Sequence, residues 1–191
     1  MITENHPFYF LEALFEKEDS IFSFSKYVYT PDALFDEREI IKIPSPELTA
    51  DRISQEISLL NQNQELSINS NVSIKGRSYH IPMIDFALEE GLSNKIIDRM
   101  FDYLPKAIVL SMAFYHSGNS YHAYSTTLLS PKEWLEFMGR LLLINPRGGQ
   151  QIIDSRWIGH RIIGGYSSLR WSNNSSIYKK PPSRVPYPWH R

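Results

Sequence analysis

The sequence predicts one compact body of mixed α+β structure. Segments whose apolar residues alternate with period two, as in strands, stand between segments with the wider apolar spacing of helices. From residue 79 onward these segments follow the order strand, helix, strand, strand, helix. The chain has 191 residues, of which 42% are hydrophobic, and this is enough to bury one sizeable core.

The first 66 residues are expected to form an N-terminal elaboration of helices and strands packed on the core. "HPFYFLEALFEKE" (6–18) has helical spacing, and "SIFSFSKYVYT" (20–30) alternates until Pro31 ends it. "EIIKIP" (39–44) is a candidate second strand. "SPELTADRISQEISLL" (45–60) predicts a second helix, because four apolar residues fall near one helical face: Leu48, Ile53, Ile57 and Leu60. The polar stretch "NQNQELSINSN" (61–71) predicts a loop or a weak boundary.

Residues 67–182 are expected to form the core. Its strands are predicted at 79–86, 107–115 and 121–129, and its helices at 92–104 and 130–143. Ser93 and Ser130 stand where helix N-caps belong, and Pro131 suits a first helical position. The turn "SGNS" (117–120) joins the last two strands. Residues 183–191 are expected to form an extended basic tail that is rich in proline.

Composition excludes several classes of protein. The absence of cysteine rules out a disulfide framework and a thiolate zinc site, so we expect no zinc and a cytoplasmic location. The N-terminal residues carry acids where a signal peptide needs bases, and no apolar run reaches the roughly 20 residues of a membrane span. We therefore expect no membrane partner. From Asn145 onward, eight basic residues stand against one acidic residue, Asp154, which indicates either a polyanion-binding surface or solvated charge.

Two aspartates that follow apolar runs are candidate metal ligands. Asp85 stands at the end of a predicted strand, and Asp154 follows two isoleucines. A carboxylate at the end of a buried strand is costly unless it is paired or coordinated. Two such acids that converge from separate strands could share Mg²⁺ or Mn²⁺, which prefer oxygen ligands and substrate phosphates. Each aspartate alone could instead cap a helix or sit in a turn. His122 begins the strand after the turn and could share a sheet face with Asp85.

Aromatic and basic residues interleave in the last quarter of the chain, a pairing that suits single-stranded nucleic acid. The residues are Trp157, Tyr166 and Trp171 among Arg156, Arg161 and Arg170. Arg161 is the predicted nucleic-acid contact among them, although part of these aromatic side chains could belong to the core. His160 is a secondary candidate for a phosphate or base contact, with a structural role as its alternative.

Taken in order, these motifs resemble the archaeo-eukaryotic primase superfamily over about residues 79–182. The motifs are the apolar strand that ends at Asp85, the hairpin "SGNSYH" (117–122), the second apolar-Asp pattern at Asp154, and "SSLRWSNNSSIYKKP" (167–181). The resemblance implies a short primase-like protein with an RRM-like catalytic core. It also implies that Asp85 and Asp154 bind the metal and, with His122, carry catalysis.

The resemblance also implies which residues bind the substrates. The nucleotide would be held by Ser117, Gly118, His122, Arg170 and Ser172, and nucleic acid by Arg161, Lys179 and Lys180. The implied function is a metal-dependent nucleotidyltransferase of DNA replication that binds a nucleoside triphosphate and single-stranded DNA or RNA. A separate helicase or accessory protein is a further expected partner, because the chain contains no helicase or zinc module.

One position departs from the family pattern, in which a second acid follows two residues after the first so that both side chains share one strand face. Ala87 stands there, and Glu89 and Glu90 are the nearest replacements. Two other functions therefore stay open. One is a primase-derived module that binds nucleotide and nucleic acid without catalysis. The other is a phosphodiesterase in which Asp85, His122 and Asp154 hold a metal that activates water.

Overall fold

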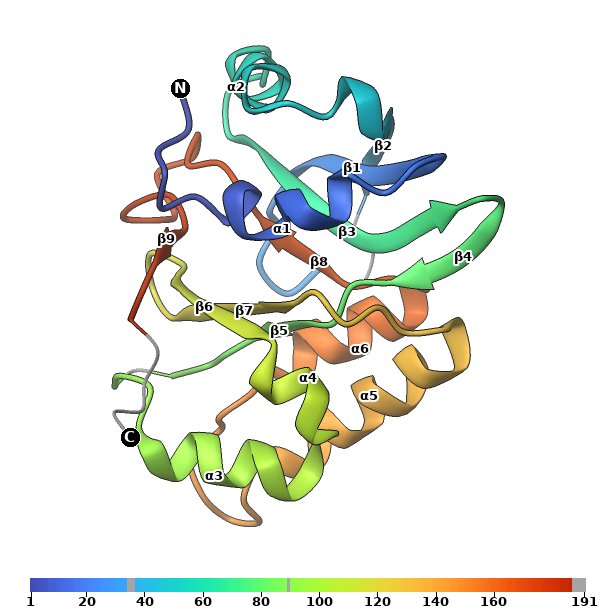
Figure 1. Ribbon diagram of the computed structural model, residues 1–191. Helices are drawn as coiled ribbons and strands as arrows, with labels where there is room; N and C mark the ends of the chain where they lie inside the picture. The colour runs from blue at the N-terminus through green and yellow to red at the C-terminus, as the bar shows by residue number, and fades with distance from the viewer. Residues whose placement is uncertain (34–36, 89, 187–191) are drawn as a thin grey trace.

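A computed structural model describes residues 1–33, 37–88 and 90–186 of the chain (Figure 1). The helices are α1 (Pro7–Phe15), the 3₁₀ turn η1 (Ser45–Glu47), α2 (Ala50–Ser58), α3 (Asn94–Tyr103), α4 (Lys106–Leu110), α5 (Pro131–Ile144) and α6 (Ser155–Gly164). The strands are β1 (Ser20–Val28), β2 (Glu39–Pro44), β3 (Gln64–Ile74), β4 (Arg77–His80), β5 (Met83–Asp85), β6 (Met112–His116), β7 (Tyr121–Ser125), β8 (Ser168–Arg170) and β9 (Ser183–Arg184). The predicted α+β class is confirmed.

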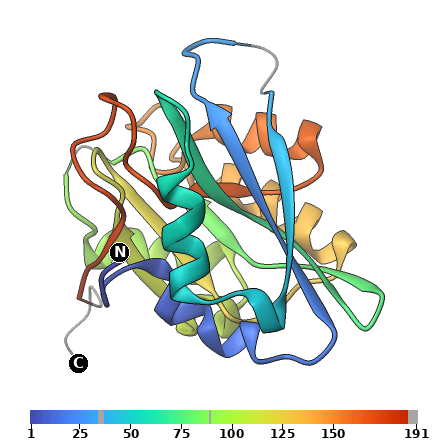
Figure 2. The ribbon, with the colours of Figure 1, turned by 90° about the horizontal axis from the view of Figure 1, so that it is seen from above.

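The strands form two antiparallel sheets. The first has the order β2-β1-β3-β4, with β8 paired to β3 off this path, and the second has the order β5-β7-β6-β9. In Figure 1 the first sheet lies above the second, and α3, α4 and α5 lie below both. Figure 2, seen from above, shows α2 on the outer side of the first sheet. The second sheet is thus enclosed between the first sheet and a layer of helices.

Alternation along the strands of the second sheet divides the core into two hydrophobic clusters. Tyr115 and Tyr124 point to the first sheet, where they join residues of α1, β1 and β3 around the fully buried Trp171. Phe114 and Ala123 point the other way, into the cluster formed with α3, α4, α5 and α6. Successive side chains of a strand face opposite sides, so a sheet with a core on each side is apolar throughout.

Four predicted helices are present at the expected places: α1, α2, α3 and α5. The start of α5 shows the local chemistry most clearly. The Ser130 side chain accepts from the N–H of Glu133, the Glu133 carboxylate accepts from the N–H of Ser130, and Pro131 occupies the first turn. This capping box satisfies backbone donors that would otherwise lack partners.

The predicted loop at 61–71 is wrong, because β3 begins at Gln64 and is the central strand of the first sheet. Several of its polar side chains are buried, and Asn69 is bonded to neighbouring strands. Asn69 accepts from Ser25 (2.7 Å) and from Ser168 (2.8 Å), and donates to Ser23 (3.0 Å). β3 also runs through the expected boundary between residues 66 and 67, so the segments on both sides of it share one sheet.

Two predicted strands are each split in the structure. The segment 79–86 divides at Pro82 into β4, which belongs to the first sheet, and β5, which belongs to the second. Proline cannot donate a ladder hydrogen bond, which suits this change of sheet. The segment 107–115 begins as helix α4, with Pro105 at its N-cap, and becomes strand β6 only at Met112. A short apolar run does not distinguish a buried helix from a buried strand.

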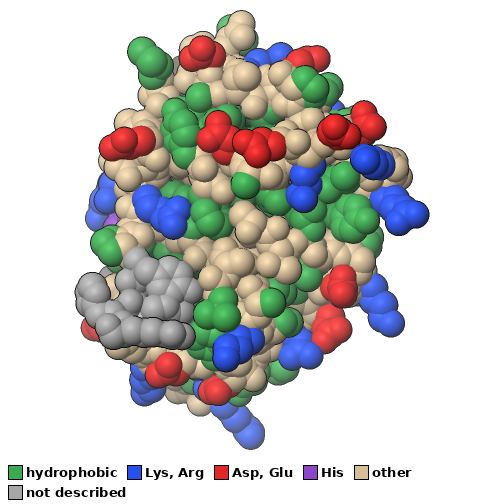
Figure 3. Space-filling model, viewed as in Figure 1, with side chains coloured by type: hydrophobic (Ala, Val, Ile, Leu, Met, Phe, Trp, Pro, Cys, Tyr) green, Lys and Arg blue, Asp and Glu red, His purple; other side chains and the backbone are tan. Residues whose placement is uncertain are grey.

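The structure also bears on the predictions about membrane helices, surface charge and the C-terminal segment. Within the three described ranges, none of the helices combines the length and apolar character that a membrane crossing requires. On the face drawn in Figure 3, basic and acidic side chains are interspersed rather than gathered by sign. In the segment expected as an extended tail, Ser183 and Arg184 form β9, which pairs with the edge of β6.

Candidate functional site

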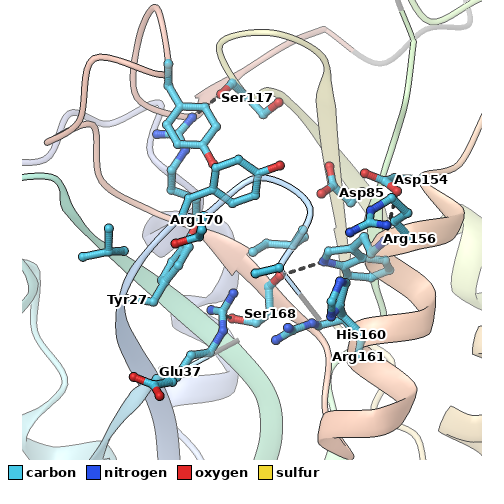
Figure 4. A pocket seen from close by; sticks show the side chains of 18 of the residues that line it. Tyr27, Glu37, Asp85, Ser117, Asp154, Arg156, His160, Arg161, Ser168 and Arg170 are labelled. Carbon is cyan, nitrogen blue, oxygen red and sulfur yellow. Dashed lines mark hydrogen bonds between the residues drawn. The ribbon is translucent and has the colours of Figure 1, made fainter. Parts of the chain in front are cut away.

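A pocket of about 830 Å³ opens where the two sheets meet α6 (Figure 4). Residues of β1 and β8 from the first sheet and of β5 and β7 from the second line it, together with the turn between β6 and β7. Segments from both halves of the sequence therefore form one cavity.

The two predicted metal ligands lie side by side in this pocket. Asp85 is the last residue of β5, and Asp154 is the N-cap of α6. The N–H of Asp154 donates to the carbonyl of Asp85 at 3.0 Å. Oδ1 of Asp154 also accepts from the N–H of Trp157 at 2.9 Å, as an N-cap does. The prediction that Asp154 converges from a strand is wrong, because Asp154 is the N-cap of α6. The cap uses one carboxylate oxygen, Oδ1, so the metal-ligand role of Asp154 stays a prediction.

His122 lies next to Asp85 because β7 runs antiparallel to β5 with these two residues opposite each other. Its Nε2 is 3.6 Å from Oδ1 of Asp85, and the residue is only 5% exposed. Its Nδ1 is buried and has no hydrogen-bond partner among the described residues. The imidazole of His122 thus has one buried nitrogen that no described residue satisfies.

The electrostatics favour the uncharged forms of both Asp85 and His122. Burial, reinforced by the negative charge of Asp154, raises the pKa of Asp85 from 3.8 to about 8, and the nearby arginines only partly oppose this. Burial, reinforced by the positive charge of Arg170, lowers the pKa of His122 well below 6.5. A divalent cation at Asp85 would therefore have to displace a proton.

The turn 117–120 is built around Ser117 and Gly118. The N–H of Ser117 donates to the carbonyl of Ser120 at 2.8 Å, and the hydroxyl of Ser117 accepts from the N–H of Ser120 at 3.4 Å. Gly118 has φ +105°, and a Cβ there would lie 3.0 Å from the carbonyl oxygen of Lys180. The sequence indicated a tight turn, and the close approach of a distant segment adds a second reason for glycine.

The other predicted site residues divide into two groups. Arg161 and Arg170 line the pocket and are nearly fully buried. Ser172 instead accepts a hydrogen bond from the N–H of Leu66 and donates to Glu65, away from the pocket lining. Lys179 and Lys180 are exposed. Their backbone lies beside Gly118 of the turn, and their side chains do not line the pocket. The basic final quarter of the chain is therefore partly buried.

Two pocket residues of the first sheet were not predicted. The guanidinium of Arg38 lies 3.9 Å above the ring of Tyr27, and its Nη1 donates to the hydroxyls of Ser67 and Ser168 at 3.0 Å each. Local pattern marks Tyr27 only as an inward strand residue, and nothing near Arg38 indicates a site. Of the interleaved aromatics, Trp157 lines the pocket, whereas Trp171 belongs to the core.

The donors in the pocket suit one hard divalent cation with few protein ligands. Asp85 and Asp154 supply carboxylate oxygens, and magnesium commonly binds one or two carboxylates with substrate phosphates and water. Ala87 has no side-chain oxygen that could bind the ion. Its backbone N–H donates to the carbonyl of Ile152 at 2.9 Å. Glu89 lies outside the described residues, and Glu90 is exposed. Over the described ranges, no three His, Asp or Glu side chains gather as a metal site.

The profile of the family described as archaeo-eukaryotic primase 1D-like matches residues 44–183. The chain belongs to this family. The primase resemblance predicted from the motifs is confirmed, and the match extends it upstream through α2 and β3. No curated protein and no solved structure gives a significant match. The matched range contains both aspartates, the hairpin with His122 and Arg170, whereas the pocket wall that holds Tyr27 and Arg38 lies upstream of it.

Proposed function

We propose that this primase-family protein binds a nucleoside triphosphate with one Mg²⁺ or Mn²⁺ ion in the pocket and transfers the nucleotide to a nucleic-acid strand. The observation that carries the proposal is the meeting of Asp85, Asp154 and His122 in one cavity, although these residues lie on three separate elements. The family membership supports the same conclusion independently.

Each pocket residue has a distinct task in this proposal. The ion, held by Asp85 and Asp154, would neutralise phosphate charge and polarise the phosphoryl group. The neutral imidazole of His122 donates a hydrogen bond to a phosphate oxygen, and the hydroxyl of Ser117 does the same from the turn. Arg156 faces the pocket and has a 3.8 Å ion pair with Asp32 between two exposed side chains, a weak contact that a phosphate replaces.

Nucleic acid is proposed to bind at the outer part of the same site. Trp157 offers a ring for base stacking in the pocket wall, held in place because its indole N–H donates to the carbonyl of Ser168 at 2.9 Å. Lys179 and Lys180 are exposed beside the turn and suit phosphates of a single strand.

A second candidate function is nucleotide and nucleic-acid binding without catalysis. It is favoured by Ala87, because two-metal phosphoryl transfer needs more carboxylate ligands than the pair that the described residues supply. In this case the same pocket binds the triphosphate, and no bond is formed.

Template-dependent incorporation of labelled nucleotide separates the two candidates. The wild-type protein, the Asp85→Asn variant and an Asp98→Asn control on the exposed side of α3 are incubated with a primed single strand, Mn²⁺ and labelled triphosphates. Incorporation that is lost only in Asp85→Asn supports the transferase. Calorimetric binding of the triphosphate without incorporation supports the binding module, and release of phosphate without incorporation indicates hydrolysis. The absence of both binding and turnover would contradict the proposed function.

A further inference from the structure

Arg170 is placed as a structural connector rather than as an open cation. It ends β8 and is 3% exposed. Its Nη1 donates to the carbonyl of Ser172, and its Nη2 donates to the carbonyls of Ser117 and of Lys180, the latter at 3.3 Å. The ring of Tyr178 lies 3.8 Å from its guanidinium carbon. One side chain thus joins β8 to the turn 117–120 and to residues 172–180, which we call the C-terminal strap.

The first part of the strap has its own anchor on the first sheet. The carboxylate of Glu65, fully buried in β3, accepts hydrogen bonds from the hydroxyls of Ser172 and Ser175 and from the N–H groups of Asn174 (3.0 Å) and Ser175 (2.9 Å). Charge-assisted bonds of this kind are the stronger ones. Beyond residue 175, Arg170 contacts the strap at the carbonyl of Lys180 and at the ring of Tyr178.

The turn is shaped to receive the strap. A Cβ on Gly118 would lie 3.0 Å from the carbonyl oxygen of Lys180 and 3.4 Å from Nη2 of Arg170, and Asn119 donates to the carbonyl of Ile177 at 3.3 Å. Backbone therefore packs directly on backbone here. Three of the five N–H donors of Arg170 are bound to carbonyls, and its Nε is shielded from solvent.

We propose that Arg170 is a positioning residue that locks the C-terminal strap against the turn and thereby sets Ser117 and Tyr178 in the pocket wall. This inference rests on the proposed function in one respect. It implies that groups other than Arg170 contact the phosphates of the bound nucleotide. Most N–H donors of the guanidinium are already bound to backbone carbonyls, so an anion would compete with those carbonyls for them. The planar fork of arginine holds three carbonyls and stacks on a ring at once, which the single ammonium of lysine cannot do.

Tryptic cleavage after Lys179 measures the locking directly and needs no nucleotide. We compare wild type with Arg170→Lys, with Gly118→Ala, which leaves Arg170 and the cleavage sequence unchanged, and with Arg52→Lys on α2 as a control. When opening and closing are fast, the cleavage rate follows the open population. Loss of a charge-assisted hydrogen bond predicts cleavage that is about ten- to a hundredfold faster in Arg170→Lys. Gly118→Ala should also be cleaved faster, because its Cβ would crowd the carbonyl oxygen of Lys180. Cleavage after Arg77, in the exposed β3–β4 hairpin, should stay unchanged in all variants.

Binding of ATP and AMP distinguishes positioning from direct phosphate contact. Positioning predicts that Arg170→Lys and Gly118→Ala change the affinities for ATP and AMP in the same way as each other, because both variants loosen the same strap. Direct contact predicts that Arg170→Lys retains most ATP affinity, whereas Arg170→Gln loses it and loses less for AMP; this result would overturn the inference. Wild-type cleavage rates after Lys179 in both Arg170→Lys and Gly118→Ala would also overturn it. If the wild-type protein binds neither nucleotide, the proposed function fails while the proteolysis still decides the role of Arg170.

Discussion

Replacing Asp85 by asparagine should make the protein more stable at neutral pH while it removes metal binding. In the folded protein the pKa of Asp85 is raised from 3.8 to about 8 by burial and by Asp154. A folded-state pKa above the unfolded value means that the folded state binds the proton more tightly. The Asp85 carboxyl therefore favours folding most below about pH 4, and this contribution is lost as the pH rises towards 8. Asparagine has the same shape and never ionises.

The size of the effect follows from the same shift. Each pKa unit corresponds to about 1.4 kcal/mol, so ionisable Asp85 costs up to about 4 kcal/mol at pH 7 relative to a permanently neutral group. The side chain is 27% exposed, and solvent screening reduces that bound. We expect the free energy of unfolding of Asp85→Asn to exceed that of wild type by about 2 kcal/mol at pH 7 and by almost nothing at pH 4.

Urea unfolding at pH 4, 5.5, 7 and 8, with Asp98→Asn as the exposed control, measures this difference. Calorimetry with Mn²⁺ on the same samples measures the metal affinity. A variant that is equally or less stable than wild type at every pH would refute the electrostatic reasoning. Unchanged Mn²⁺ affinity would refute the assignment of Asp85 as a ligand. A gain in stability with a loss of metal binding is the pattern expected of a carboxylate kept for function.

Three further predictions follow from other contacts. His122→Ala should weaken binding of a nucleoside triphosphate about ten- to a hundredfold and that of the bare nucleoside little, as calorimetry would show; a lower melting temperature with an unchanged preference would instead indicate a purely structural histidine. Glu65→Gln should lower the free energy of unfolding by about 2 kcal/mol in urea titrations, because the buried carboxylate accepts several hydrogen bonds, and an unchanged midpoint contradicts this. Replacing Lys179 and Lys180 by alanine should flatten the log–log salt dependence of single-strand binding by about 0.7 for each lost phosphate contact, and an unchanged slope would mean that these charges are only solvated.

Local sequence rules predicted the helices α1, α2, α3 and α5 but missed the polar strand β3. The start of α5 could be predicted from Ser130 and Pro131 because capping depends on neighbours in the chain. The burial of Asn69 could not, because its partners Ser25 and Ser168 come from strands that are distant in sequence. A polar residue on a central strand is tolerated only when such partners exist, and a single segment does not reveal them.

The candidate site shows the same division. Asp85 and His122 were predicted to be neighbours because the strands that carry them were identified and adjacent strands tend to pair. The wall that holds Tyr27 and Arg38 was missed, because it is formed by packing of the first sheet over the second. Motifs mark residues that need a particular chemistry, whereas the opposite wall of a pocket is determined by tertiary arrangement.

The short strand β9 has a consequence for self-association. By pairing Ser183 with His116 and Arg184 with Tyr115, it occupies backbone groups along the outer edge of β6, and the N–H of Val185 donates to the carbonyl of Phe114 at 3.0 Å. Open strand edges are templates on which another chain can add a strand. The residues of β9 thus protect the edge of β6 from intermolecular strand pairing, and a shortened chain that lacks them would present an unpaired strand edge close to the turn 117–120.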